Sequence, residues 1–257
     1  MHLLERRTKP RFSIVPIPDV HAPFTDKGCW RAGLDVVRGF RKEITHVVIL
    51  GDFGDFAWAS DHPRSEPSDI DGEYRQMAEH SKELRDAAGE RAGQIKWFWM
   101  QGNHEYRIDR RNVKCKMRDG LLPPWKSEYK DSFAHLKIIR YSFSREGMLR
   151  IGNTVCYHGS AVGETSDRTE GLRMRHLVGD SPNLLTVRGH THTVTVPQPI
   201  RIGAGVRSTQ WMFNPGHWGP ADPPYAENEN RTTWGSAVSV IRQWGYELPR
   251  VQYEIVR

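Results

Sequence analysis

The stretch Val47-Val48-Ile49-Leu50-Gly51-Asp52-Phe53-Gly54-Asp55 (VVILGDFGD, residues 47–55) joins a short apolar run to two aspartates. The run is too short for a helix and rich in β-branched residues, so it predicts a buried strand. Four further apolar runs have the same character, at residues 12–18, 95–100, 154–157 and 184–187. Because proline cannot donate to a ladder, Pro16 and Pro18 predict an irregular or early-ending strand in the first of these runs.

The segments around these runs predict an α/β fold. Apolar residues at near-helical spacing indicate an amphipathic helix from about residue 70 to 92, and shorter helices are expected over 104–117 and 172–177. Beyond these segments the pattern favours strands, separated by glycine and proline clusters, over 193–202, 206–214, 236–243 and 250–256, with a proline-rich loop over 214–224. Strands that alternate with helices, followed by strands alone, predict two packed sheets with helices outside them.

Length and composition indicate one globular domain over residues 1–257, with a helical excursion at about 56–93. The 37% hydrophobic and 26% charged residues exclude a fibrous, disordered or membrane-spanning class. Lys and Arg total 37 against 31 Asp and Glu, and the resulting charge of +6 favours anionic partners. Cys29, Cys115 and Cys156 lie far apart, which argues against a thiolate zinc site and for a reducing, cytoplasmic compartment. We expect no export signal and no membrane partner.

Each of the five apolar runs ends in Asp, Asn or His. The endings are Asp19-Val20-His21, Gly51–Asp55, Gly102-Asn103-His104-Glu105, His158-Gly159 and Gly189-His190-Thr191-His192. Sites in open α/β sheets form beyond the carboxyl ends of strands, so these endings are expected to converge on one pocket. Two carboxylates, one amide and four imidazoles suit Mn²⁺, Fe, Zn²⁺, Co²⁺ or Ni²⁺ better than Ca²⁺. Seven ligands are too many for one tetrahedral ion and fit two metals that share a bridging carboxylate.

In this order, the motifs D-x-H, G-D-x-x-D, G-N-H-E, H-G and G-H-T-H resemble those of the calcineurin-like metallophosphoesterase superfamily, over residues 19–192. The resemblance implies a four-layer α/β/β/α sandwich of two packed mixed β-sheets flanked by helices. Within the family, G-D-F-x-D-F, the segment Ser60-Asp61-His62-Pro63 and G-N-H-E-x-R are most similar to members encoded by phages and prophages.

The resemblance also implies a binuclear metal centre that hydrolyses phosphoesters. It assigns one metal to Asp19, His21, Asp52 and His192, and the other to Asp52, Asn103, His158 and His190. Asp52 would bridge the two ions, and a hydroxide between them would attack phosphorus. Mn²⁺ is the expected metal, with Fe, Zn, Co or Ni as alternatives. His104 resembles the family histidine that stabilises the transition state or protonates the leaving alkoxide, and Asp55 would orient and charge its imidazole.

The residue after Asp55 bears on the substrate. Protein Ser/Thr phosphatases of this family have Arg at that position, whereas Phe56 stands here. A phosphomonoester dianion needs this positive charge more than a diester monoanion, so a phosphodiester in a nucleotide or nucleic acid is favoured. A phosphomonoesterase is the alternative, because other guanidinium groups could reach the site, from Arg107, Arg110, Arg168 or Arg173.

Nucleic acid is kept as an alternative partner, and the oligomeric state is left open. The basic stretch from Arg107 to Arg118 could bind a polyanion, although such a run is more often a solvated helix face. Trp58 and Trp218, both expected in loops, are candidates for base stacking. The remaining histidines are treated as structural: His2, His46, His62, His80, His135, His176 and His217. A non-catalytic scaffold on the same fold is the alternative of another class, and the presence of His104 argues against it.

Overall fold

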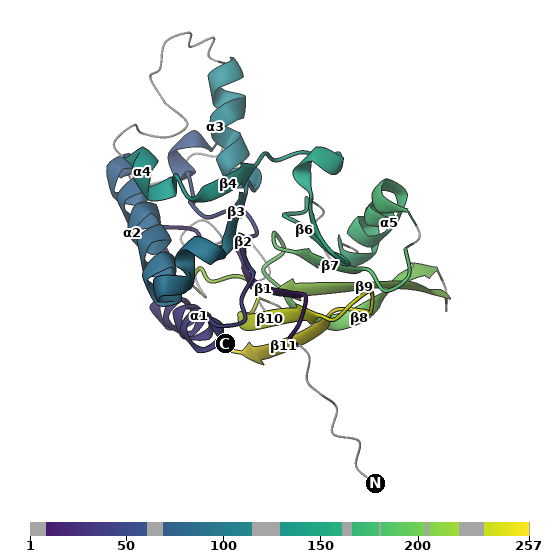
Figure 1. Ribbon diagram of the computed structural model, residues 1–257. Coiled ribbons are helices and arrows are strands. Elements are labelled where there is room, and N and C mark those ends of the chain that lie inside the picture. The colour runs from purple at the N-terminus through teal and green to yellow at the C-terminus, as the bar shows by residue number, and fades with distance from the viewer. Residues whose placement is uncertain are drawn as a thin grey trace.

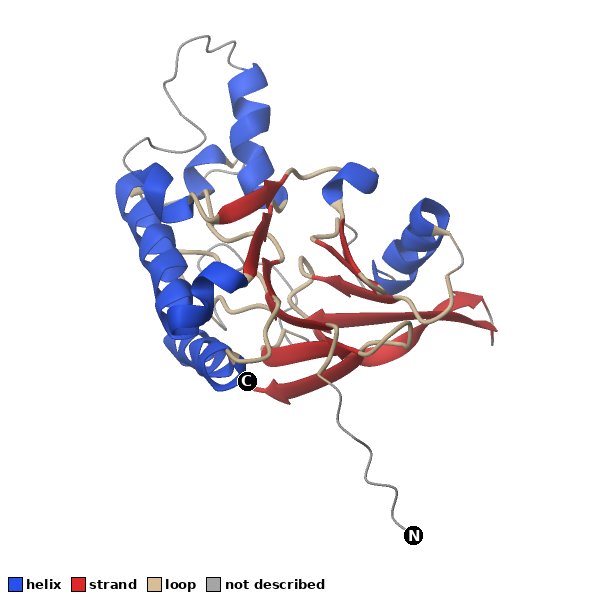
Figure 2. Ribbon diagram, in the orientation of Figure 1, coloured by secondary structure: helices blue, strands red, loops and turns tan. Residues whose placement is uncertain are grey.

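Two mixed β-sheets pack face to face, and helices cover their outer faces (Figures 1 and 2). The α/β sandwich of two sheets flanked by helices, expected from the sequence, is therefore confirmed. The computed structural model describes residues 9–60, 69–114, 129–160, 166–179, 181–203, 206–220 and 234–256. Asp61, His62 and Pro63 of the phage-like segment, and the basic residues after Lys114, lie outside these ranges.

The first sheet has six strands in the order β11-β10-β1-β2-β3-β4. Strands β1 to β4 are parallel neighbours, and β10 and β11 are added antiparallel at the β1 edge. Because β1, β2 and β3 run in the same direction, the polar residues after them emerge at one edge of the sheet. The bounds are β1 Phe12–Ile17, β2 His46–Ile49, β3 Lys96–Met100, β4 Leu136–Ile139, β10 Ala237–Gln243 and β11 Arg250–Ile255.

The second sheet has five strands in the order β5-β6-β7-β9-β8. Its central strands β6, β7 and β9 are parallel, whereas β5 and β8 pair antiparallel at the two edges. The segments after β6 and β7 carry His158 and His190 toward the first sheet. The bounds are β5 Leu149–Ile151, β6 Thr154–Tyr157, β7 Leu185–Arg188, β8 Val194–Gly203 and β9 Val206–Pro215.

Helices α1 and α2 lie together on the outer face of the six-stranded sheet, and α5 packs on β8 of the other sheet (Figure 1). Asp26 begins α1 by accepting a hydrogen bond from the Cys29 N–H, and Asp69 caps α2 in the same way. In the described part of the chain, no helix combines the length and apolarity that crossing a membrane requires. The helix bounds are α1 Lys27–Phe40, α2 Ile70–Ala88, α3 Asn103–Lys114, α4 Lys130–Phe133 and α5 Ser166–Val178, with short 3₁₀ segments at η1 Ala57–Ala59, η2 Gly89–Gln94 and η4 Arg145–Gly147.

The two faces of the first sheet bury different cores. Val15 and Ile17 of β1 point toward α1 and α2, whereas Ile14, Val48 and Leu50 pack against the second sheet. Alternate residues of a strand point to opposite faces, so a sheet covered on both sides needs an unbroken apolar run. This requirement explains why the run Val47–Leu50 has no polar residue.

Several elements differ from the sequence-based expectation. The helix expected to about residue 92 ends at Ala88 and continues as η2. Strand β1 is regular through Pro16, which lies opposite Val48 in the parallel pairing. The sequence pattern did not predict α1, β4 or β5. Strand β9 extends to Pro215, so the loop expected from residue 214 begins later, and its continuation beyond residue 220 lies outside the described residues.

The prediction that Trp218 stacks on bases is wrong. Its ring is buried, packs edge-on against Trp30, and donates through Nε1 to the Ala237 carbonyl at 3.1 Å. The loop after β9 folds under α1, which places Trp218 in the core. Trp58 is half-buried and contacts Phe56 edge-on.

The contact between Gly33 and Trp218 generates a stability prediction. A Cβ on Gly33 would come within 2.2 Å of the Trp218 ring, whereas a Cβ on Gly39 of the same helix would meet nothing within 4 Å. We expect Gly33→Ala to lower the free energy of unfolding by about 1–3 kcal/mol through overpacking. Gly39→Ala, the matched control, should raise it by up to about 1 kcal/mol through helix propensity. Urea denaturation measures both, and an equal change in the two variants would contradict the packing argument.

Candidate metal centre

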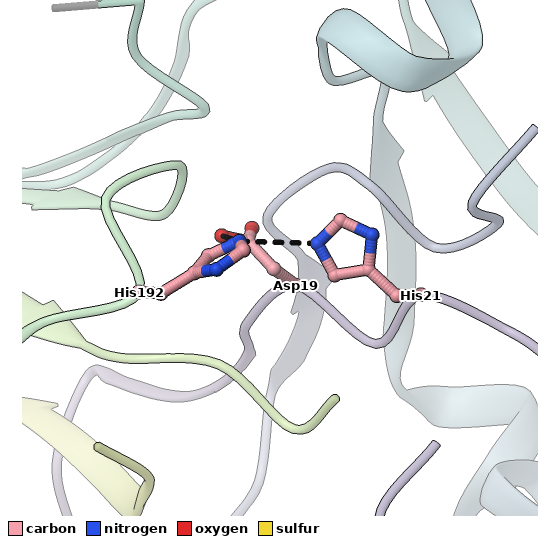
Figure 3. Close-up of side chains that lie close together, drawn as sticks. All are labelled: Asp19, His21 and His192. Atoms are coloured by element: carbon pink, nitrogen blue, oxygen red, sulfur yellow. Dashed lines mark hydrogen bonds and ion pairs between the residues drawn. The ribbon is translucent and has the colours of Figure 1, made fainter. Parts of the chain in front are cut away.

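Segments from both sheets bring Asp19, His21 and His192 together (Figure 3). Asp19 and His21 follow β1, and His192 follows β7. The two imidazole Nε2 atoms lie 3.1 Å apart, and His192 Nε2 lies 3.5 Å from Asp19 Oδ2. One ligand atom from each of the three buried residues lies within 4.8 Å of the other two. A carboxylate and two imidazoles that converge in this way form a suitable partial coordination shell for a transition metal.

A second cluster contains Asp52, His158 and His190, whose ligand atoms also lie within 4.8 Å of one another. His158 Nε2 is 3.3 Å from Asp52 Oδ2. Asn103 joins this cluster, because its Oδ1 lies 2.9 Å from His158 Nε2 and 2.8 Å from His190 Nδ1. One carboxylate, one amide oxygen and two imidazoles therefore converge at this second position.

The two clusters adjoin at Asp52 and Asp19. His158 Nδ1 lies 3.5 Å from Asp19 Oδ1, and Asp52 also groups with His21 and His104 within 4.8 Å. All seven residues predicted as ligands from the sequence are thus brought together, which is the spatial convergence that the strand endings required. Their role as metal ligands stays a prediction.

The backbone at the clusters is held in an unusual conformation. Six described residues other than glycine have positive φ, and four of them are His21 at 52°, Asp52 at 45°, His190 at 75° and His192 at 58°. Left-handed backbone is costly for residues with a Cβ and concentrates at functional sites, where the surrounding structure enforces it. The protein therefore directs these side chains inward at the expense of local backbone strain.

Two glycines allow the carboxylates to approach the neighbouring loops closely. A Cβ on Gly102 would lie 2.1 Å from Asp52 Oδ1, and one on Gly189 would lie 2.3 Å from Asp19 Oδ1. Asp19 Oδ2 in turn accepts a hydrogen bond from the His190 N–H at 2.6 Å. Gly102 of G-N-H-E and Gly189 of G-H-T-H are needed because the carboxylates of Asp52 and Asp19 occupy the space that a Cβ at these positions would fill.

The two aspartates have opposite tendencies to ionise. Burial raises the pKa of Asp19 to about 7, since it penalises the charged form. Burial acts on Asp52 in the same direction, but the positive charges of His104 and His158 outweigh it and hold the pKa of Asp52 well below its usual range. Asp52, which borders both clusters, is therefore the carboxylate that stays ionised.

The imidazoles differ as well. Burial lowers the pKa of His190 to about 3, with a further contribution from the charge on His158, and burial also lowers the pKa of His192. Burial opposes protonation of His158 too, but the carboxylates of Asp52 and Asp19 outweigh it and raise its pKa to about 9. His190 and His192 are thus neutral at physiological pH, which is the form that binds metals. The oxygen and imidazole donors of the clusters, with Asp52 ionised and His190 and His192 neutral, are suited to hold divalent metal.

His104 and Asp55 form a pair at the edge of the clusters. His104 Nδ1 donates to the Asp55 carbonyl oxygen at 2.6 Å and lies 3.3 Å from Asp55 Oδ1. The same carboxylate lies 3.4 Å from His21 Nδ1. Burial would raise the pKa of Asp55, but hydrogen bonds from His104 and His21 outweigh it and lower that pKa. Asp55 therefore contacts His104, and it also contacts His21, which the sequence did not indicate. That Asp55 orients the His104 ring stays a prediction.

Two buried glutamates were given no role by the sequence analysis. Glu105 accepts hydrogen bonds from the N–H groups of Asp52 at 3.0 Å, Phe53 at 2.7 Å and Gly102 at 2.7 Å. Glu73 of α2 accepts from the Phe56 N–H, and burial raises its pKa to about 8. The two side chains hold the loop after β2 from both of its ends. Glu105 is the last residue of the motif G-N-H-E and could have been singled out on that ground. Glu73 belongs to no motif.

His217, which was treated as structural, also lies beside the clusters. Its buried ring stacks on that of His192, with centroids 4.6 Å apart and an interplanar angle of 10°. Trp234 packs edge-on against both rings. His217 and Trp234 thus fix the orientation of the His192 ring, a contact that only the tertiary structure reveals.

A comparison with protein families agrees with this geometry. The family model described as "Calcineurin-like phosphoesterase" matches residues 12–194. Among curated proteins, no sequence matches the chain. Among solved structures, the chain is similar to a hypothetical protein from Thermus thermophilus, with 14% identity over 95% of this chain and 100% of that chain, at a TM-score of 0.43. A TM-score this low supports no argument about fold or function. The family match covers β1 to β7 and every predicted ligand, and the chain belongs to the calcineurin-like phosphoesterases.

Proposed function

We propose that this phosphoesterase is a binuclear-metal-dependent phosphodiesterase that acts on nucleotide or nucleic-acid diesters. The observation that carries the proposal is the pair of adjoining clusters, Asp19-His21-His192 and Asp52-His158-His190, which border each other at Asp52. Asn103 would complete the second cluster. Two ions are proposed, with Mn²⁺ favoured, because the donors are oxygen and imidazole nitrogen without thiolate.

The residues around the clusters suggest how the reaction proceeds. When bound, two divalent cations would supply positive charge and an activated water for in-line displacement at phosphorus. His104 uses Nδ1 to donate to Asp55, which leaves Nε2, 3.8 Å from Asp52 Oδ2, to hold a proton for the departing alkoxide.

The preference for diesters is supported by the position of Phe56. Its side chain is fully buried in the core, so the position that carries Arg in protein phosphatases provides no cation to the site. Arg107 approaches from α3, with its NH1 3.1 Å from His104 Nδ1 and 3.4 Å from the Asp55 carbonyl. A phosphomonoesterase that uses Arg107 is the second candidate, and the contact with His104 is the observation that favours it.

Three further assignments are part of the proposal. The similarity to phage- and prophage-encoded members is kept, although part of the segment that carries it lies outside the described residues. A cytoplasmic location follows from the isolated cysteines, two of which, Cys29 and Cys156, are buried free thiols. Nucleic acid is kept as a partner, and a non-catalytic scaffold is disfavoured because His104 and Asp55 are arranged for proton transfer.

The role of Asp52 is tested by Asp52→Asn. The substitution removes the negative charge at the border of the two clusters, so we expect bound metal to fall at both positions and turnover to fall to the background rate. Elemental analysis and a phosphodiester assay measure the two effects. Asp35→Asn, at an exposed position of α1, is the matched control and should leave both unchanged. A fully active variant with two bound metals would refute the bridging role.

The role of His104 is tested by His104→Ala with esters whose leaving groups differ in pKa. We expect metal content near normal and hydrolysis slowed by about 10²–10⁴-fold, most of all for poor leaving groups that need a proton. His176→Ala, at a position of α5 outside the clusters, is the control. An equal loss for every leaving group would rule out proton donation by His104.

The substrate class is tested by comparing bis-p-nitrophenyl phosphate with p-nitrophenyl phosphate in the presence of Mn²⁺. We expect a higher kcat/KM for the diester, because no arginine follows Asp55 to neutralise a dianion. Removal of the metal with a chelator should abolish both activities, and readdition should restore them. A clear preference for the monoester would favour the phosphomonoesterase instead.

A further inference from the structure

A small hollow lies beside the candidate ligand His158. Its walls include Tyr141, Phe143, Met148, Tyr157, Gly159 and Arg173. Gln101, Ser142 and Gly147 complete the walls, so the hollow extends from the predicted ligand His158 along aromatic, polar and glycine residues together.

Three aromatic side chains form a continuous row: Tyr141 and Phe143 line the hollow, and Tyr106 packs against Tyr141. Tyr141 lies with its ring centroid 6.1 Å from that of His158, and the rings of Tyr106 and Phe143 each lie 5.4 Å from Tyr141. Phe143 is 60% exposed and Tyr106 is 40% exposed. Single exposed aromatic residues are common, but a row that leads outward from a metal cluster offers flat surfaces to a ligand bound there.

The row is held in place by its surroundings. Tyr141 donates through its hydroxyl to the Gly159 carbonyl at 3.3 Å, and its backbone N–H donates to Gln101 Oε1 at 3.3 Å. The guanidinium carbon of Arg173 lies 5.0 Å from the centroid of the Phe143 ring, and Arg173 is itself paired with Glu170 at 3.2 Å. A cation over an aromatic face fixes that ring, so little entropy is lost when a ligand stacks on it.

We propose that Tyr106, Tyr141 and Phe143 form a subsite that stacks a nucleobase of the phosphodiester bound at the metal clusters. The inference rests on the proposed function, since it names the group attached to the scissile phosphate. The sugar of a nucleotide separates the base from the phosphate, and Tyr141 is likewise set back from the metal cluster by the ring of His158. Every base has a π-face, so stacking of this kind tolerates different bases. The subsite therefore selects nucleoside diesters over other diesters with little preference among the bases.

The test uses two dinucleotides that differ only in their bases: thymidylyl-thymidine and the same diester built from tetrahydrofuran abasic units. The scissile phosphodiester linkage is the same in both. We expect wild-type protein loaded with Mn²⁺ to favour the base-containing substrate about tenfold or more in kcat/KM. Phe143→Ala should bring this ratio toward one, and Phe143→Trp should restore it. Tyr246→Ala, which removes an 81% exposed aromatic ring at the β10–β11 turn, should leave it unchanged.

Binding provides a second readout that does not depend on turnover. Calorimetry measures the affinity of wild-type protein and of Phe143→Ala for thymidine 5′-phosphate, with deoxyribose 5-phosphate as the ligand that lacks a base. Thymidine 5′-phosphate should bind about tenfold more tightly to the wild type than to the variant. A base preference in binding without any hydrolysis would refute the proposed function and support the subsite. Equal kcat/KM and equal affinity with and without bases would overturn the subsite, as would a ratio that Phe143→Ala leaves unchanged.

The stacked base could belong to a small cyclic nucleotide or to a nucleic-acid strand. To distinguish the two, a cyclic nucleotide and a single-stranded oligonucleotide are hydrolysed in the same assay as the dinucleotide. Loss of rate in Phe143→Ala confined to the cyclic nucleotide assigns the subsite to small cyclic diesters. Loss confined to the dinucleotide and the oligonucleotide assigns it to a nucleic-acid strand. Both results support the stacking proposal, and equal rates of wild type and variant on all three substrates overturn it.

Discussion

The position of Asp52 directly after β2 is the constraint on which the rest of the site depends. Its backbone has a φ of 45°, its N–H donates to Glu105, and its Oδ1 accepts from the His104 N–H at 2.9 Å. The last contact places the carboxylate at the amino end of α3, where the helix favours negative charge. The left-handed backbone, the buried glutamate and the helix terminus thus act on one residue, and together they hold Asp52 where the two clusters adjoin.

The sequence predicts the parts of this arrangement that depend on local pattern. Buried parallel strands need unbroken apolar runs, and the residues after them need polar atoms at one edge, so Asp19, Asp52 and His158 could be recognised without coordinates. Helix α1 could not, because Gly28, Gly33 and Gly39 weaken the helical signal over residues 27–40. Its formation depends on tertiary contacts, above all the fit of Trp218 against Gly33.

The supporting residues of the site were hidden for a related reason. Glu73 acts on the backbone N–H of Phe56, and His217 acts through the face of a ring that arrives from another loop. Neither contact leaves a pattern in the sequence, because backbone groups are present at every residue and stacking has no fixed spacing along the chain. A motif therefore reveals residues that share a local segment, whereas those that orient them from a distance are found only when the chain is folded.

The charge around the clusters bears on the choice between monoesters and diesters. Among the described residues, Arg107, Arg173 and Arg188 bring guanidinium groups near the predicted ligands. Arg107 points its NH1 toward the Asp55 carbonyl, which also accepts from His104, and Arg173 is paired with the buried carboxylate of Glu170. The Glu170 carboxylate offsets the charge of Arg173, whereas a hydrogen bond to a neutral carbonyl leaves the charge of Arg107 in place. Because Glu170 offsets the charge of Arg173, the protein offers a bound phosphate less positive charge than three unpaired arginines would, which agrees with the proposed preference for diesters.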